Sequence, residues 1–187
     1  MAAPAWTRAE LDDEQNLIER ARRDRTAFTV LYRRHYEAIA RYIHRRVGDS
    51  HTTEDLTAEV FIAALRTLPR YRHRGWPLRT WLYRIATNRV NRWARRERKR
   101  VLKRLESDHV DPKGAANEAG MNAEYVRTAL LTLSPKHQAV LSLHYLEGMP
   151  VDEVAVAVGC RIGTVKSRLA RGREALRRHL EQRRSRL

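Results

Sequence analysis

Apolar residues recur every three or four positions along most of this 187-residue chain, and no useful stretch alternates apolar with polar residues. The first spacing puts apolar side chains on one face of a helix, whereas alternation would indicate a strand. The sequence therefore predicts an all-α protein. The expected helices cover residues 26–46, 53–68, 78–100, 123–133, 135–146, 151–158 and 163–182. Helix ends are expected at Gly48, Gly75, Gly148 and Gly159, because glycine readily takes the positive φ of a C-terminal cap.

The helical pattern breaks in the acidic segment ESDHVDPKGAANEAG, residues 106–120. Pro112, Gly114 and Gly120 interrupt this segment, which predicts a flexible linker between two small helical domains. The expected organisation is an N-terminal extension (1–25), a first domain (26–104), the linker (105–121) and a second domain (122–187).

The second domain holds a short apolar helix, a glycine turn and a basic helix. Val151, Val154, Ala155 and Val158 recur at i, i+3, i+4 and i+7, and Gly159 allows a sharp turn after them. The pattern indicates a helix-turn-helix whose second helix enters a DNA major groove. An ordinary helical hairpin with a solvated basic face is the alternative. The candidate DNA contacts are Arg161, Thr164, Lys166, Ser167, Arg168 and Arg171.

The net charge and its distribution indicate the kind of partner that this chain binds. The net charge is +16 and the pI about 11.0, an excess that favours a polyanionic partner, with nucleic acid first and a membrane surface second. Residues 66–104 alone carry 15 Lys and Arg against one acid. No apolar run approaches the roughly 18 residues needed to span a bilayer, and the N-terminus lacks a signal peptide. We therefore expect a cytoplasmic protein with no membrane insertion.

The basic stretch LRTWLYRIATNRVNRWARRERKR, residues 78–100, forms a helix that can lie along a phosphate backbone. Tyr71, Trp76, Trp81 and Tyr83 supply flat apolar surfaces near its cations, a combination typical of single-strand binding. Trp81 or Trp93 is expected in the core, whereas Trp76 falls in a loop. The candidate contacts are Trp76, Arg79, Arg84, Asn88, Arg92 and Arg95.

The helix TEDLTAEVFIAAL, residues 53–65, carries Asp55 and Glu59 four positions apart, on one face. By the pattern alone, these carboxylates are either solvated or paired with arginines of the same chain.

Three stretches resemble bacterial RNA polymerase sigma factors. GTVKSRLARGREALRRHL is similar to their promoter-reading C-terminal domain, TWLYRIATN to their region 2, and TEDLTAEVFIAAL to the region 2.2 surface that docks on the polymerase clamp helices. The short linker and the lack of further regions resemble the extracytoplasmic-function (ECF) type, and the resemblance covers residues 27–104 and 121–181.

The resemblance implies a factor that binds the polymerase core and directs promoter-specific initiation. It implies that the helix-turn-helix reads the minus-thirty-five duplex, while the loop of residues 71–77 takes a flipped base of the minus-ten strand. Asp55 and Glu59 match acidic docking positions. An anti-sigma factor is a further partner that the resemblance suggests, although no residue identifies one.

Six positions depart from the family pattern, including Cys160, where the family usually has an aliphatic residue. Pro150 and Arg161 stand where the family commonly has an N-cap Ser, whose loss costs about 1 kcal/mol. Leu78 replaces a frequent Phe, Arg92 a frequent Asp and Ala58 a frequent Gln. The single cysteine, Cys160, is interpreted as a packing residue rather than a redox sensor.

Two other classes of function were weighed against this interpretation. The eight histidines include no helical i, i+3 or i, i+4 pair, and the chain has no phosphate-binding glycine loop, so we expect no enzyme activity, metal or cofactor. A stand-alone helix-turn-helix regulator is the more serious alternative, but it has no obvious use for a second, aromatic-bearing basic module.

Overall fold

The computed structural model describes residues 8–72, 75–107 and 128–184, and within these ranges every regular element is a helix and no strand is present. The all-α prediction is confirmed for this part of the chain. The elements are α1 (Arg8–Arg23), α2 (Arg25–Val47), α3 (Ser50–Thr67), the short 3-10 turn η1 (Leu68–Arg70), α4 (Leu78–Ser107), α6 (Pro135–Leu141), the π-turn η2 (Ser142–Leu146), α7 (Val151–Val158) and α8 (Ile162–Arg184).

Short polar caps define the tight turns between the first helices. Asp24 Oδ1 accepts a hydrogen bond from Thr26 N (2.8 Å) at the start of α2, and Asp49 Oδ2 accepts one from Thr52 N (2.7 Å) at the start of α3. Gly48 ends α2 with a φ of 82°, as expected from the sequence. These caps also lower the pKa of both aspartates, chiefly through the side-chain bonds to Thr26 and Thr52.

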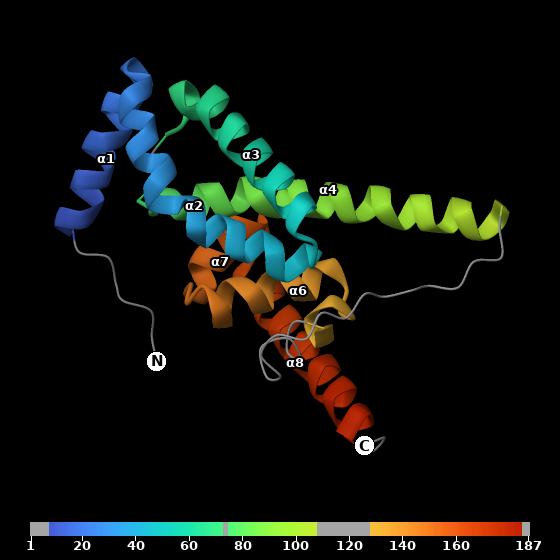
Figure 1. Ribbon diagram of the computed structural model, residues 1–187. Coiled ribbons are helices and arrows are strands. Elements are labelled where there is room, and N and C mark those ends of the chain that lie inside the picture. The colour runs from blue at the N-terminus through green and yellow to red at the C-terminus, as the bar shows by residue number, and fades with distance from the viewer. Residues whose placement is uncertain (1–7, 73–74, 108–127, 185–187) are drawn as a thin grey trace.

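The long helix α4 runs through the middle of the molecule. Figure 1 shows α2 and α3 crossing α4, with α1 beside α2, and α6, α7 and α8 below α4. Between α2 and α4, Tyr42 is fully buried and its hydroxyl lies 2.7 Å from Thr87 Oγ1. The core of the first helical unit is therefore built around α4.

The second helical unit packs directly on α4 through α7. Met149, Val154 and Ala157 are at most 1% exposed, and they belong to the same buried cluster as Leu82 and Ala86 of α4. The two helical units of the sequence prediction are therefore both present, and in the described residues they share one continuous core.

Three local features differ from the sequence prediction. Helix α1 lies in the predicted N-terminal extension, for which no helix bounds were predicted, and α4 continues to Ser107 rather than ending near residue 100. The expected helix 135–146 is regular only to Leu141 and then widens into a π-turn, in which Glu147 N donates to Ser142 O. Most of the linker and residues 123–127 of the expected helix 123–133 lie outside the described residues; residues 128–131 are helical, and a turn follows at 132–133.

Candidate nucleic-acid interface

The helix-turn-helix consists of α7, Gly159 and α8. Gly159 has a φ of 68°, a left-handed conformation that ends α7 and reverses the chain. Val154 and Val165 are fully buried, and Leu169 is 6% exposed, so apolar contacts hold α7 against α8. The scaffold predicted from the sequence is confirmed.

The six residues predicted to contact the minus-thirty-five duplex all lie at the start of α8. Arg161, Lys166, Ser167 and Arg171 are exposed, whereas Thr164 and Arg168 are half-buried. Arg168 Nη1 approaches Cys160 Sγ (3.7 Å), which places the lone cysteine under the recognition helix. The helix begins without a hydroxyl cap, since the backbone oxygen of Arg161 accepts from Thr164 N and Val165 N.

The cations of α8 also act on a histidine of the neighbouring helix. Burial lowers the pKa of His137 of α6, and Lys136, Arg168 and Arg171 lower it further. The exposed Lys166 and Arg171 and the half-buried Arg168 concentrate positive charge on this face of α8, which suits a phosphate backbone.

The residues predicted to contact the minus-ten strand line α4. Arg84, Asn88, Arg92 and Arg95 are exposed, and Trp76 is half-buried just before the helix. Tyr83 was expected as an aromatic surface for a base, which is wrong: it is 3% exposed and packs edge-on against Tyr42 (5.3 Å between ring centroids). Trp81 and Trp93 are partly buried against the core, as expected for at least one of them.

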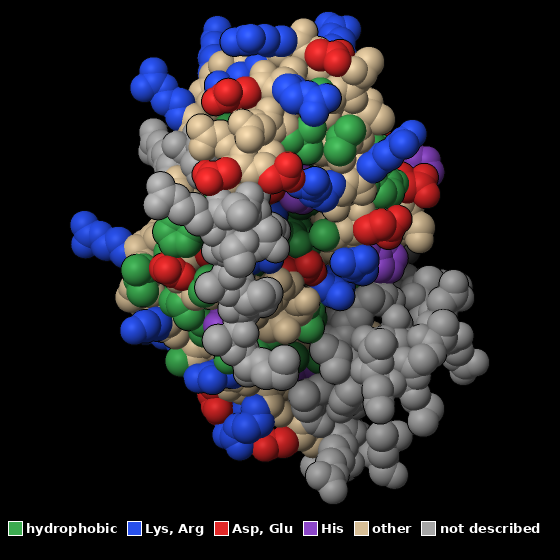
Figure 2. Space-filling model, turned by 90° about the vertical axis from the view of Figure 1, so that its left-hand side faces the viewer, with side chains coloured by type: hydrophobic (Ala, Val, Ile, Leu, Met, Phe, Trp, Pro, Cys, Tyr) green, Lys and Arg blue, Asp and Glu red, His purple; other side chains and the backbone are tan. Residues whose placement is uncertain are grey.

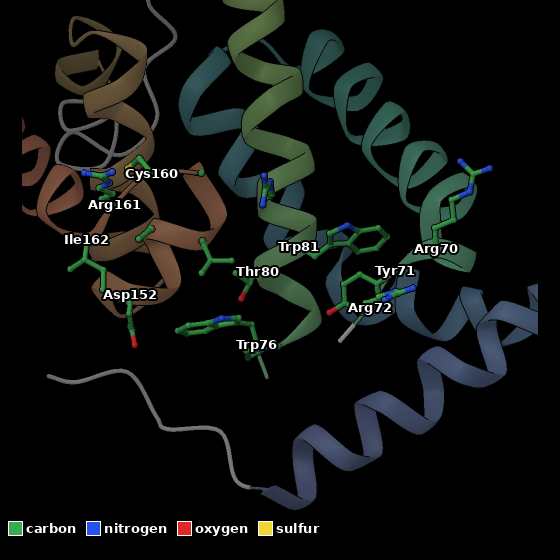
Figure 3. A pocket seen from close by; sticks show the side chains of 15 residues that line it. Arg70, Tyr71, Arg72, Trp76, Thr80, Trp81, Asp152, Cys160, Arg161 and Ile162 are labelled. Atoms are coloured by element: carbon green, nitrogen blue, oxygen red, sulfur yellow. The ribbon is translucent and has the colours of Figure 1, made fainter. Parts of the chain in front are cut away.

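A cavity of about 1120 Å³ lies between the loop that precedes α4 and the helix-turn-helix. One wall consists of Tyr71, Trp76 and Trp81, with the Tyr71 and Trp81 rings 4.6 Å apart, and the opposite wall of Cys160 and Ile162. Figure 3 shows Trp76 projecting toward Asp152 of α7 from the α4 side. Four arginines, Arg70, Arg72, Arg84 and Arg161, and one acid, Asp152, also line it. Aromatic planes among arginines suit a base with its phosphate.

Arg79 is the one predicted DNA contact that already has a protein carboxylate as its main partner. Its Nε and Nη2 donate to Glu153 Oε1 (2.9 Å) and Oε2 (2.7 Å), and Thr80 Oγ1 donates to Glu153 Oε1 (2.6 Å). The Glu153 side chain is 2% exposed. Two of the three guanidinium nitrogens of Arg79 are therefore already engaged by a buried carboxylate.

Glu147 makes a second polar connection between the two halves. It accepts hydrogen bonds from Arg45 of α2 and, at 2.6 Å, from the Tyr83 hydroxyl of α4. Burial raises the pKa of Tyr83, and the neighbouring Glu147 raises it further. Sequence reasoning missed Glu147 and Glu153. The sequence does show that Glu153 lies among the apolar positions of α7, which indicates a buried carboxylate. It does not show which residue pairs with Glu153.

The predicted docking residues Asp55 and Glu59 are exposed on α3. Asp55 Oδ2 lies 3.3 Å from His51 Nδ1, and Glu59 Oε2 lies 3.0 Å from Arg89 Nη1. Ala58 and Ile62 are exposed on the same helix. The two carboxylates thus share a solvent-facing surface, and Glu59 also has the intramolecular arginine partner that the sequence left open.

The view in Figure 2 is from the left of Figure 1 and shows a mixed surface. Acidic and basic side chains are interspersed on it, with Lys and Arg projecting at its edges. This face does not form a single cationic surface. In the described residues, no helix is long and apolar enough to cross a membrane.

The fold and the two basic modules define an all-α nucleic-acid-binding protein with a helix-turn-helix. A family model described as Sigma-70 region 2 matches residues 31–100, and one described as Sigma-70, region 4 matches residues 123–176. The chain belongs to the sigma-70 family and is of the ECF type.

Curated relatives agree with this assignment. The chain is 30% identical to the RNA polymerase sigma-H factor of Pseudomonas aeruginosa, over 91% of this chain and 95% of that protein. It is 30% identical to the ECF RNA polymerase sigma-E factor of Escherichia coli K12, over 87% and 92%. It is 31% identical to the ECF RNA polymerase sigma factor SigE of Mycolicibacterium smegmatis, over 80% of this chain but only 60% of that relative's length.

Solved structures share the fold. The match with CnrH, solved in complex with the cytosolic domain of CnrY, covers 90% of this chain and 97% of the CnrH chain. Its TM-score is 0.66, and the sequence identity is 23%. Bartonella quintana RpoE, in complex with the anti-sigma factor NepR, matches 82% of this chain and 96% of its own, with a TM-score of 0.66 and 24% identity.

Proposed function

We propose that this chain is an initiation factor that binds RNA polymerase core and directs it to promoters. The observation that carries the proposal is the combination of a cationic recognition helix, α8, with an aromatic wall of Tyr71, Trp76 and Trp81 beside the exposed arginines of α4. A helix in the major groove reads duplex, whereas stacking surfaces hold unpaired bases. One chain that does both suits a promoter, where duplex and melted strand lie side by side.

In this proposal the recognition helix reads the minus-thirty-five duplex and the first helical unit holds the minus-ten strand. The exposed α4 residues Arg84, Asn88, Arg92 and Arg95 follow the phosphate backbone, and Trp76 supports a flipped base. Arg79 joins this surface when its pair with Glu153 opens. The closed packing of α7 on α4 and the DNA-bound state are thus two different arrangements of the chain.

Polymerase docking is assigned to the exposed face of α3. Asp55 and Glu59 supply carboxylates for basic side chains on the clamp helices of the large subunit, and the exposed Ile62 adds an apolar contact. The factor acts in the cytoplasm with the polymerase, which supplies the catalysis, so this chain needs no cofactor. An anti-sigma partner stays a prediction from the sequence.

Run-off transcription tests the function directly. Core polymerase with the full chain on genomic fragments should give discrete transcripts whose starts share upstream elements, and core alone should not. Tight duplex binding without core, and no transcripts with it, would favour the stand-alone regulator.

The docking assignment has its own test, in the Asp55→Arg variant. It should lose core binding in a pull-down while its helix content stays unchanged by circular dichroism. Glu54→Arg, a neighbouring exposed acid on α3, is the matched control for the charge change. Unimpaired core binding by Asp55→Arg would remove this residue from the docking surface.

A further inference from the structure

Helix α1 lies outside both family matches, yet it is built into the fold. Leu17, Ile18 and Ala21 are at most 8% exposed and pack against the first helical unit, where α1 contacts α2 and η1. Figure 1 shows α1 on the same side of the molecule as the start of α4. Two polar contacts of α1 with the segment that precedes α4 indicate its role in the fold.

Glu14 of α1 caps another helix. Its side chain is 2% exposed, and its Oε2 accepts a hydrogen bond from Leu78 N, the first residue of α4, at 2.6 Å. The first N–H groups of a helix lack partners within the helix and carry partial positive charge, so a buried carboxylate stabilises them. Glu14 Oε1 lies 3.7 Å from His35 Nε2 of α2, which is also buried. The cap is thus held from two sides.

Arg22, two turns further along α1, contacts the other flank of the same loop. Its guanidinium donates to the backbone oxygen of Tyr71, the residue that follows η1. The pKa of Tyr71 is raised to about 12, chiefly by burial; Glu14 contributes to the increase, and Arg22 opposes it. Both charged groups of α1 therefore lie close to this phenol, which is itself packed on Trp81.

These two contacts bracket the aromatic wall of the cavity. Tyr71 and Trp76 are part of that wall, Arg22 holds the backbone at Tyr71, and Glu14 holds it at Leu78, two residues after Trp76. A binding surface that is ordered before its ligand arrives loses less conformational entropy on binding. The position of the wall thus depends on a helix that makes no part of the cavity lining.

We propose that Glu14 and Arg22 are positioning residues that hold the Tyr71 and Trp76 wall ready for an unpaired minus-ten base. The proposal rests on the proposed function for the nature of the ligand. Neither residue needs to touch DNA. Their effect should fall on single-strand capture and leave duplex reading and polymerase docking unchanged.

The test measures how the full chain, bound to core polymerase, binds a fluorescent single-stranded oligonucleotide that carries the mapped minus-ten element. Glu14→Leu removes the acceptor for Leu78 N and should weaken oligonucleotide binding at least about tenfold. Glu14→Gln keeps an amide oxygen at the same place and should restore binding to within about threefold of the wild type. A general folding defect would instead weaken core binding and minus-thirty-five duplex binding as well.

Arg22→Ala is the second variant, because Arg22 is exposed and its removal leaves no buried group behind. It should weaken oligonucleotide binding about threefold to tenfold. Arg23→Ala removes the same charge from the adjacent exposed position and should bind as the wild type does. Core affinity and minus-thirty-five duplex binding should be equal in all variants.

The outcomes separate the two proposals. If the wild type binds the oligonucleotide and both Glu14→Leu and Arg22→Ala bind it equally well, the positioning role is overturned. Equal losses in Arg22→Ala and Arg23→Ala would also overturn it, since net charge would then be the cause. If the wild type itself binds no oligonucleotide, the minus-ten part of the proposed function fails, and the DNA role of the two residues fails with it. In that case, faster amide hydrogen exchange at Leu78 in Glu14→Leu than in the wild type would still show that Glu14 caps α4.

Discussion

Arg79 of α4 and Glu153 of α7, 74 positions apart in the chain, form a two-point ion pair with N–O distances of 2.9 and 2.7 Å. Planar guanidinium and carboxylate groups fit each other in this arrangement, which fixes the relative orientation of the two helices as well as their distance. The pair joins a residue predicted to bind DNA to the helix-turn-helix scaffold. The packing of the two helical units therefore engages a residue that is predicted to contact DNA.

Glu153→Gln should destabilise the packed arrangement. The Arg79 side chain is only 19% exposed and would face a neutral amide in place of its carboxylate, so we expect a loss of about 3 kcal/mol in the free energy of unfolding. Urea denaturation followed by circular dichroism measures it.

Glu181→Gln is the control for that variant, because Glu181 pairs with Arg177 on the exposed side of α8. Exposed pairs contribute little, so its unfolding curve should overlay that of the wild type. If both variants unfold as the wild type does, the Arg79–Glu153 pair contributes no more than a surface pair.

Tyr83→Phe should weaken the contact between α4 and Glu147 and change how the free energy of unfolding depends on pH above neutrality. The variant lacks the hydroxyl that donates to Glu147 Oε2, a loss of about 1.5 kcal/mol at neutral pH. The pKa of Tyr83 is raised in the folded protein above its ordinary value of 10.0, so its contribution is complete below pH 10 and declines as the pH rises above it.

The measurement is the free energy of unfolding from pH 7 to pH 11. Above pH 10 the wild type should lose stability more steeply than Tyr83→Phe. The pKa of Tyr71 is also raised, so part of the loss of stability above pH 10 should occur in both proteins. Parallel curves would mean that Tyr83 ionises as freely in the folded chain as in the unfolded one.

Gly172→Ala should destabilise the second helical unit, although alanine favours a helix. A Cβ at this position would lie 3.0 Å from Leu141 Cδ1 and 3.3 Å from His137 Cβ on α6. Helix propensity favours the change by about 1 kcal/mol, whereas overpacking costs about 1–3 kcal/mol. Since the Cβ of His137 cannot rotate away, we expect a net loss of about 1 kcal/mol.

Gly163→Ala supplies the comparison within the same helix. Its new Cβ would meet no atom within 4 Å, so thermal denaturation should show a gain of up to about 1 kcal/mol. A Gly172→Ala protein that is as stable as Gly163→Ala would show that α6 shifts without cost.

Arg168→Ala should change promoter choice rather than overall activity. Arg168 lies on the recognition helix, and a good bidentate base contact contributes about 1–3 kcal/mol of discrimination. Run-off transcription from promoters with altered minus-thirty-five bases should show losses that depend on the base. Arg178→Ala, an exposed site further along α8, should not shift the preference. Uniform weakening on all promoters would instead make Arg168 a phosphate contact.

Much of the fold followed from local patterns. The helices of the first unit, the α7 stripe and the glycines with positive φ at 48, 75, 148 and 159 were predicted, because spacing and cap chemistry act over a few residues. Helix α1 was missed for a related reason. Its buried face runs through Glu14 as well as Ile18 and Ala21, and a carboxylate at a core position conceals the apolar stripe.

The sequence alone determined a helical chain with two basic modules, a helix-turn-helix and an acidic face on residues 53–65, since each depends on the identity and spacing of near neighbours. Only the tertiary structure decided that Glu14 caps α4, that Glu153 holds Arg79 and that Tyr83 is buried. Those outcomes depend on which distant groups meet when apolar surfaces pack. A buried carboxylate requires a partner, but the sequence does not specify which of 38 Lys and Arg residues, or which backbone N–H, will be beside it.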